Sequence, residues 1–263
     1  MSSYNTALIT GASSGIGRAL AVSLAGPGVS LHLCGRDTAR LEAVATECRA
    51  RGAIVEAAAR DVADAASMAD WIAAAGRLDL VVANAGISAG TGQGRAETAA
   101  QARAIFAVNL GGALNTALPA LEKMRGQAPG PDGRRGTIAV VASIAAFLPA
   151  PGAPSYCASK AAVDGWTVAT AHGATAAGIV LASVCPGYVR TAMTAPNKFP
   201  MPGLMDAERA AGIILRGLAR GRRRIVFPWW MGLAARLAGL LPPALSGRPL
   251  AIAPGKDGMP DPG

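Results

Sequence analysis

Short β-branched or leucine-rich runs alternate with longer alanine-rich stretches along this chain, from residue 6 to residue 227. This pattern is typical of a parallel sheet that is covered by helices on both faces. We therefore predict an α/β fold with a single doubly wound parallel seven-stranded sheet. The predicted strands are 6–10, 29–33, 53–58, 78–83, 137–142, 179–184 and 224–227, and the predicted helices lie near 15–25, 38–50, 64–75, 99–125, 155–176 and 206–220.

The length of 263 residues fits one large domain, because open α/β sheets commonly run to ~250 residues as a single unit. We place this domain at residues 1–228. The Gly-, Pro- and Asp-rich segment 126–136 is predicted to be an exposed loop within it. An apolar helical extension is expected at 229–245, and the Pro- and Gly-rich residues 246–263 are expected to form a disordered tail.

The formal net charge of +9 raises the question of an anionic partner. Much of the positive charge is local, within residues 220–224 and at Arg134 and Arg135, which is typical of solvated basic loops. The sequence has no zinc-ligand spacing, recognition motif or interleaved aromatic residues. We therefore expect no nucleic-acid partner.

The four cysteines form no CxxC pair, and no secretory signal precedes them. We expect free thiols in a reducing, cytoplasmic compartment, and we find no apolar run that predicts a spanning helix. His32 lies in a predicted strand and His172 late in a predicted helix, so neither suits a hydrolase triad. For the same reason we expect no metal site.

The first predicted strand runs into "TGASSGIG", with glycines at 11, 15 and 17. Small residues at such a turn let backbone N–H groups approach a pyrophosphate at the N-terminus of the following helix, where the helix dipole favours negative charge. Tight turns without a ligand are also common. The position after the first strand favours a phosphate-binding turn.

The second predicted strand ends in "LHLCGRD". Gly35 stands where an acidic residue usually holds the adenosine ribose of NAD, and Arg36 follows it. A guanidinium suits the doubly charged 2′-phosphate of NADP. This pattern favours NADP(H) over NAD(H), with ribose binding by Asp37 as the alternative.

Tyr156 and Lys160 lie four residues apart in "SYCASKAAVDGW", so they share one face of a predicted helix. Together with "TGASSGIG", "DV" at 61–62, "NAG" at 84–86, Asn109, Ser143 and "PGYVRT" at 186–191, they stand in the order and spacing of a known family. The chain resembles the short-chain dehydrogenase/reductase family over residues 6 to about 227. The resemblance implies a Rossmann-like sheet and an oxidoreductase that exchanges a hydride between NADP(H) and a carbonyl or secondary alcohol.

The resemblance also implies catalytic roles for four residues. Tyr156 would give or take the substrate proton, and Ser143 would hydrogen-bond the substrate oxygen. Lys160 would bind the nicotinamide ribose and lower the tyrosine pKa, which takes about 4 kcal/mol to move from ~10 to ~7. Asn109 would hold a water that links Lys160 to solvent. Each of them alone could be structural, for example a buried hydrogen-bonded tyrosine.

The resemblance places further residues along the cofactor. The "NAG" motif is preceded by Ala83, where the family usually has asparagine, and this departure bears on the stability of the sheet. The implied cofactor-binding residues are Gly11, Ser13, Ser14, Gly15, Ile16 and Gly17 at the phosphate turn, Arg36, Asp61 and Val62 at the adenosine, Asn84, Ala85 and Gly86 along the cofactor, Tyr156 and Lys160, and Pro186, Gly187, Val189 and Thr191 at the carboxamide end.

The C-terminal extension carries apolar residues at 230, 233, 234, 237, 240 and 241, which is helical spacing. We expect it to pack over the substrate cleft or in a dimer interface, because soluble amphipathic helices are the commoner case. Its tryptophans and arginines leave a peripheral membrane contact through 229–245 as the alternative. The apolar segment 194–205 favours a hydrophobic substrate.

Two classes of function therefore remain. The first is an NADP(H)-dependent carbonyl reductase or alcohol dehydrogenase, and the second is a non-catalytic, dinucleotide-binding regulatory protein of the same fold. The full set of Asn109, Ser143, Tyr156 and Lys160 favours the enzyme, because a binding module needs no such set. We expect a homodimer or homotetramer.

Overall fold

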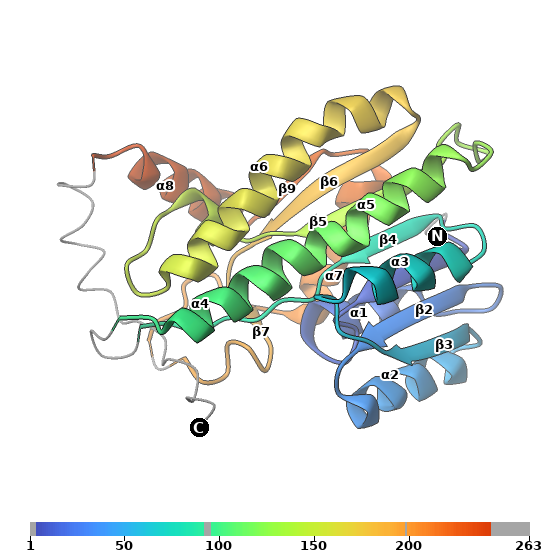
Figure 1. Ribbon diagram of the computed structural model, residues 1–263, viewed down its shortest axis with the longest axis horizontal. Coiled ribbons are helices and arrows are strands. Elements are labelled where there is room, and N and C mark those ends of the chain that lie inside the picture. Colours follow the sequence, from blue (N-terminus) through green and yellow to red (C-terminus); the bar gives the residue numbers. More distant parts are fainter. Residues whose placement is uncertain (1–3, 92–95, 198, 243–263) are drawn as a thin grey trace.

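Seven parallel strands form one sheet in the order β3-β2-β1-β4-β5-β6-β9, which confirms the predicted fold class (Figure 1). The computed structural model describes residues 4–91, 96–197 and 199–242, so the predicted tail at 246–263 lies outside the described residues. The strands are β1 (Thr6–Thr10), β2 (Ser30–Gly35), β3 (Ile54–Ala59), β4 (Leu80–Ala83), β5 (Gly136–Val141), β6 (Ile179–Pro186) and β9 (Arg224–Phe227).

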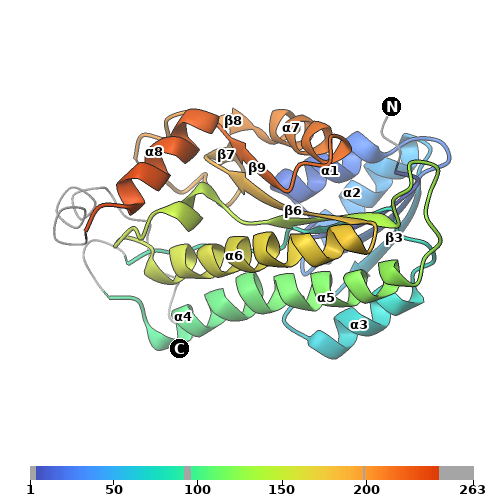
Figure 2. The ribbon, with the colours of Figure 1, turned by 90° about the horizontal axis from the view of Figure 1, so that it is seen from above.

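Helices cover both faces of the sheet (Figure 2). One face carries α1 (Gly15–Leu24), α2 (Thr38–Ala50) and α7 (Ala207–Ala219), and the other carries α3 (Ala65–Ala74), α4 (Ala99–Phe106), α5 (Gly112–Arg125) and α6 (Pro154–Ala176). Smaller elements are the π-helical turn η1 (Ala107–Gly111), the 3₁₀ turn η2 (Ile144–Phe147), the paired strands β7 (Val189–Arg190) and β8 (Met205–Asp206), and the C-terminal helix α8 (Trp229–Gly239).

Each face of the sheet has its own apolar core, because successive side chains of a strand point to opposite faces. Ile9 of β1 and Val82 of β4 pack with α1, α2 and α7, whereas their neighbours Leu8 and Val81 pack with α3, α5 and α6. All four residues are fully buried. A strand that is apolar on both sides belongs in the middle of such a sheet.

The strand order reverses between β1 and β4, the point at which open α/β sheets bind their ligands. The loops after β1, β4, β5 and β6 all leave from the carboxyl edge of the sheet, because these strands are parallel. The fold therefore gathers "TGASSGIG", "NAG", Ser143 and "PGYVRT" at one edge.

The continuous helix Ala99–Arg125 is the only helix in the described part of the chain that is both long and apolar enough to cross a membrane. Half of its most apolar window is buried inside the protein. This helix comprises α4, η1 and α5, and it contacts α6 and α3. Its apolar character is that of a core helix.

Candidate active site

A cavity of about 1190 Å³ lies at the carboxyl edge of the sheet, and it brings together nearly all of the predicted site residues. Gly17 and Asn109 are the two predicted residues that do not line it. The predicted residues that do line it are Gly11, Ser13, Ser14, Gly15, Ile16, Arg36, Asp61, Val62, Asn84, Ala85, Gly86, Ser143, Tyr156, Lys160, Pro186, Gly187, Val189 and Thr191.

In the glycine turn, main-chain atoms of neighbouring segments lie too close together to leave room for a Cβ atom. Gly11 and Gly15 have φ of 65° and 55°, which favours glycine. A Cβ on Gly17 would stand 2.3 Å from the carbonyl oxygen of Gly11. The first turn of α1 contains no acidic residue, and the Ser14 side chain makes no capping hydrogen bond there. The N-terminus of α1 therefore presents backbone N–H groups to the cavity.

Thr10 and Asn84 fasten the turn to the end of β4. The Thr10 hydroxyl accepts from the backbone N–H groups of Asn84 (3.0 Å) and Ala85 (3.2 Å). The Asn84 amide donates in return to the carbonyl oxygens of Thr10 (3.0 Å) and Gly11 (3.2 Å). These four hydrogen bonds fix "NAG" against the glycine turn.

At the other end of the cavity, Arg36 is exposed and lies on the wall together with Arg40 and Arg60. The Asp37 carboxylate is engaged, because it accepts from the backbone N–H of Arg40 (2.9 Å) and pairs with the Arg40 guanidinium (2.7 Å). These bonds hold the pKa of Asp37 below its ordinary value. The carboxylate caps α2, and the neighbouring guanidinium groups make this end of the cavity cationic.

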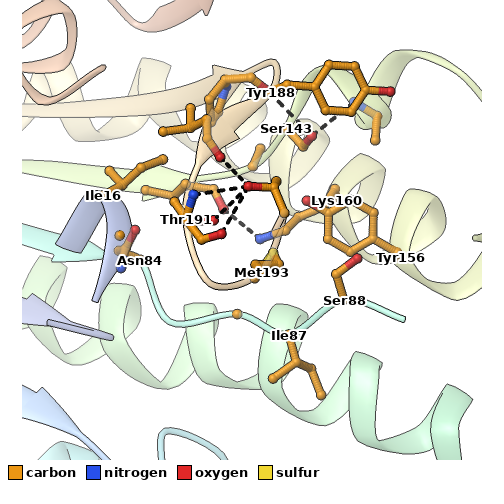
Figure 3. A pocket seen from close by; sticks show the side chains of 18 of the residues that line it. Ile16, Asn84, Ile87, Ser88, Ser143, Tyr156, Lys160, Tyr188, Thr191 and Met193 are labelled. Atoms are coloured by element: carbon orange, nitrogen blue, oxygen red, sulfur yellow. Dashed lines mark hydrogen bonds between the residues drawn. The ribbon is translucent and has the colours of Figure 1, made fainter. Parts of the chain in front are cut away.

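Ser143, Tyr156 and Lys160 lie around one space, as Figure 3 shows. Ser143 follows β5, and α6 presents Tyr156 and Lys160 from consecutive turns. The Lys160 ammonium is 5.9 Å from the centre of the tyrosine ring and donates to the carbonyl oxygen of Val141 at 2.8 Å. Lys160 is 4% exposed, so its ammonium is held inside the wall.

Burial disfavours charge on both α6 residues. It raises the pKa of Tyr156 above its ordinary value, although a hydrogen bond with Ser143 opposes the shift. Burial lowers the pKa of Lys160 to about 8, with a small opposing effect of Cys185. In the protein chain alone the Tyr156 pKa is therefore raised and not lowered, because desolvation outweighs the Ser143 hydrogen bond.

Asn109 lies behind the cavity wall, on the π-helical turn η1. Its amide oxygen accepts from the backbone N–H of Ile87 (2.8 Å), and its amide nitrogen donates to the Ile87 carbonyl (3.0 Å) and to the Ser159 hydroxyl (3.1 Å). Ser159 in turn donates to the carbonyl oxygen of Tyr156 at 2.8 Å. Asn109 thus joins the loop after β4 to the first turns of α6.

The model of a protein family described as short chain dehydrogenase matches residues 5–200. An uncharacterized oxidoreductase of Myxococcus xanthus is 37% identical over 244 residues, which cover 91% of this chain and 94% of the relative. The chain belongs to the short-chain dehydrogenase family. It is therefore an oxidoreductase.

Two solved members of the family have the same fold. A short-chain dehydrogenase from Sphingobium yanoikuyae, in complex with NADPH, is 27% identical, with a TM-score of 0.77 and coverage of 94% of both chains. A short-chain dehydrogenase/reductase from Burkholderia phymatum, in complex with NAD, is 25% identical, with a TM-score of 0.75 and coverage of 97% of this chain and 98% of the neighbour.

This short-chain dehydrogenase also has cavity residues that the sequence analysis did not single out. Arg40 lies in the first turn of α2, four residues after Arg36, and a second arginine so near the end of the second predicted strand is a signal that the sequence offers. Leu148 and Ile144 gave no local signal, because their place depends on how β6 and η2 meet, whereas Tyr188 stands within the "PGYVRT" segment. The inner side of α8 contributes Met231, Ala234, Ala235 and Ala238.

Proposed function

We propose that this short-chain dehydrogenase is an NADP(H)-dependent carbonyl reductase or alcohol dehydrogenase that acts on apolar substrates. The observation that carries the proposal is the meeting of Ser143, Tyr156 and Lys160 in one cavity with the glycine turn. The cofactor end and the substrate end of the cavity support different parts of the proposal.

The residues of the glycine turn fit a dinucleotide. A Cβ on Gly11 would stand 2.8 Å from the Cα of Ala85, so only glycine leaves the backbone N–H groups open to a pyrophosphate here. Ser13, Ser14 and Ile16 would line the phosphates, and Asp61 and Val62 the adenine. Asn84, Ala85 and Gly86 would lie along the cofactor, with Pro186, Gly187, Val189 and Thr191 at its carboxamide.

The cationic end of the cavity favours NADP(H) over NAD(H). Asp37, the one acidic candidate for the ribose, is occupied by Arg40 and by the N-terminus of α2. A Cβ on Gly35 would stand 3.2 Å from the Ser13 hydroxyl, which leaves little room for a longer acidic side chain. Arg36 would bind the 2′-phosphate, because a guanidinium matches phosphate geometry.

The substrate end supplies the groups for proton transfer. Bound NADP(H) supplies or accepts the hydride. The Tyr156 hydroxyl gives its proton to the substrate oxygen in reduction or takes it in oxidation, while the Ser143 hydroxyl donates to the same oxygen. Lys160 binds the nicotinamide ribose, and its ammonium favours the tyrosine anion. Asn109 holds the Ile87 backbone in place, and in this proposal it also holds a water that links Lys160 to solvent.

The wall beyond Tyr156 favours an apolar substrate. Its residues come from η2, from the segment after Thr191 and from α8, and none of those that follow carries a charge: Ile144, Leu148, Met193, Phe199, Pro202, Met231 and Ala235. Apolar walls with a few placed polar groups are typical of sites for small apolar ligands. The four free cysteines suit the cytoplasmic location that we propose.

The test of the cofactor assignment is fluorescence titration of the wild type and of Arg36→Ala with NADPH and NADH. We expect tighter binding of NADPH, and a loss of at least tenfold in NADPH affinity in Arg36→Ala with NADH affinity unchanged. Equal binding of the two cofactors by the wild type would contradict the assignment to NADP(H).

A further inference from the structure

Large apolar side chains that are exposed gather on one helix. Ten such side chains are found in the described ranges 4–91, 96–197 and 199–242, and six of them lie on α8 or within two residues of its end. The six define the outer face of α8, and their exposed fractions are Trp229 73%, Trp230 44%, Leu233 51%, Leu237 58%, Leu240 81% and Leu241 49%.

A second side of α8 fixes the helix to the protein. A Cβ on Gly232 would stand 2.3 Å from Cγ1 of Val226, and a Cβ on Gly239 would stand 2.2 Å from the carbonyl oxygen of Phe147. The Arg236 guanidinium lies over the Phe147 ring, 4.3 Å from its centre. These close contacts hold α8 against β9 and η2, and they leave much of the outer face exposed within the described part of the chain.

A third side of α8 lines the cavity through Met231, Ala234, Ala235 and Ala238. These residues are spaced three or four positions apart, so they share one side of the helix. This side differs from the outer face. The packing over the cleft that the sequence favoured is therefore present. It uses Met231 and three alanines of α8 and not the tryptophans and leucines of the outer face.

The sequence that leads into α8 carries no acidic residue from residue 209 on. Residues 209–242 contain no Asp or Glu, and their arginines are at 209, 216, 220, 222, 223, 224 and 236. Among these, Arg224 pairs with Asp164. The segment 209–242 is thus basic and apolar in sequence, a combination that matches an anionic lipid surface. Tryptophan also prefers the membrane–water interface.

We infer that the outer face of α8 docks this protein on an anionic lipid bilayer. Trp229 and Trp230 lie at the start of the inserted face, Leu233 and Leu237 continue it, and arginines before and within α8 supply the positive charge. Docking sets the cavity wall formed by α8 beside the bilayer. If the proposed function holds, apolar carbonyl or alcohol substrates pass to the cavity from the lipid.

The test is co-sedimentation of the full chain with vesicles of equal parts phosphatidylglycerol and phosphatidylcholine, and with vesicles of phosphatidylcholine alone. The variant is Leu233→Ser/Leu237→Ser. Its matched control is Ile54→Ser/Leu118→Ser, which removes leucine and isoleucine side chains of similar exposure (72% and 51%) from β3 and α5. Thermal melting and NADPH titration show that each variant is folded.

We expect the wild type and the control to bind the mixed vesicles, with a blue shift of tryptophan emission and weaker binding in high salt. Leu233→Ser/Leu237→Ser should lose at least tenfold in affinity for the vesicles. Equal binding by all three proteins, no binding by the wild type, or equal binding to phosphatidylcholine alone would overturn the inference. Light scattering that shows an oligomer in the wild type and in the control, but not in Leu233→Ser/Leu237→Ser, would also overturn the inference. NADPH titration is independent of vesicle binding, so each proposal can fail alone.

Discussion

At the scale of single residues, Tyr156 and Lys160 share an environment that favours the neutral form of both. Burial raises the pKa of the tyrosine and lowers that of the lysine to about 8. The Lys160 ammonium also donates a hydrogen bond to the carbonyl oxygen of Val141. The pairing of these two residues on α6 could be read from their spacing, but the direction of the pKa shifts could not, because it depends on what encloses them.

Lys160 should make the cofactor-free protein less stable below pH 8. Its pKa in the folded protein, about 8, lies below its ordinary value of 10.5. The unfolded chain therefore holds the proton between these pH values, and stability rises with pH across this window. The free energy of unfolding rises by roughly 3 kcal/mol over this window, because one pKa unit corresponds to about 1.36 kcal/mol.

Urea unfolding of the wild type and of Lys160→Met checks this expectation. The stability difference between the two proteins should change by roughly 3 kcal/mol between pH 8 and pH 10.5 in favour of the wild type. A difference that stays constant over this range would contradict burial as the cause of the shift.

Gly17 should tolerate no side chain, although it does not line the cavity. A Cβ there would stand 2.3 Å from the Gly11 carbonyl oxygen and 2.6 Å from the Asn84 amide nitrogen, so Gly17→Ala should displace the phosphate turn. We expect a loss of at least tenfold in NADPH affinity by titration. The control is Gly26→Ala, because no atom lies within 4 Å of a Cβ at Gly26. Equal affinities of the two variants would disprove this account of the turn.

At the scale of elements, the sequence predicted all seven strands of the main sheet, because each is a short apolar run bounded by turn residues. It did not predict the π-helical turn within 99–125 or the turn η2, since neither has a local sequence signal. Glu97 is a further example. Its carboxylate accepts from the backbone N–H of Ser155 at 3.1 Å and from the Ser155 hydroxyl, and so it holds the start of α6 from a distant part of the chain.

The edge strand β9 should depend on one partly buried ion pair. Arg224 donates to both oxygens of Asp164 on α6, at 3.0 and 2.7 Å, and the Ser183 hydroxyl donates to the same carboxylate at 2.6 Å. Asp164 is 6% exposed. Arg224→Met leaves this carboxylate buried and unpaired, which should cost about 3 kcal/mol in the free energy of unfolding.

Urea unfolding measures this cost, and Arg224→Met/Asp164→Asn is the matched control. The double variant should recover part of the lost stability, because it removes the buried charge. An Arg224→Met protein as stable as the wild type would show that the pair does not hold β9 to α6.

At the scale of the whole molecule, the reversal of strand order between β1 and β4 explains why motifs far apart in the sequence meet. The alternation of strands and helices was enough to predict the doubly wound sheet, and the motifs at the strand ends were enough to predict one wall of the cavity. The substrate wall was harder to predict. Met231 and Ala235 belong to it only because Gly232 and Gly239 let α8 approach β9 and η2. The homodimer or homotetramer expected from the resemblance stays a prediction.

The proposed function requires that the cavity is a catalytic site in which Tyr156 transfers the substrate proton. The most direct measurement is the rate of NADPH oxidation with a panel of apolar ketones, for the wild type and for Tyr156→Phe, with NADPH affinity measured on the same samples. We expect turnover by the wild type and a loss of about 10²- to 10⁴-fold in Tyr156→Phe at unchanged NADPH affinity. Equal rates in both proteins, or tight NADPH binding without turnover of any ketone or of the matching alcohols with NADP⁺, would contradict it.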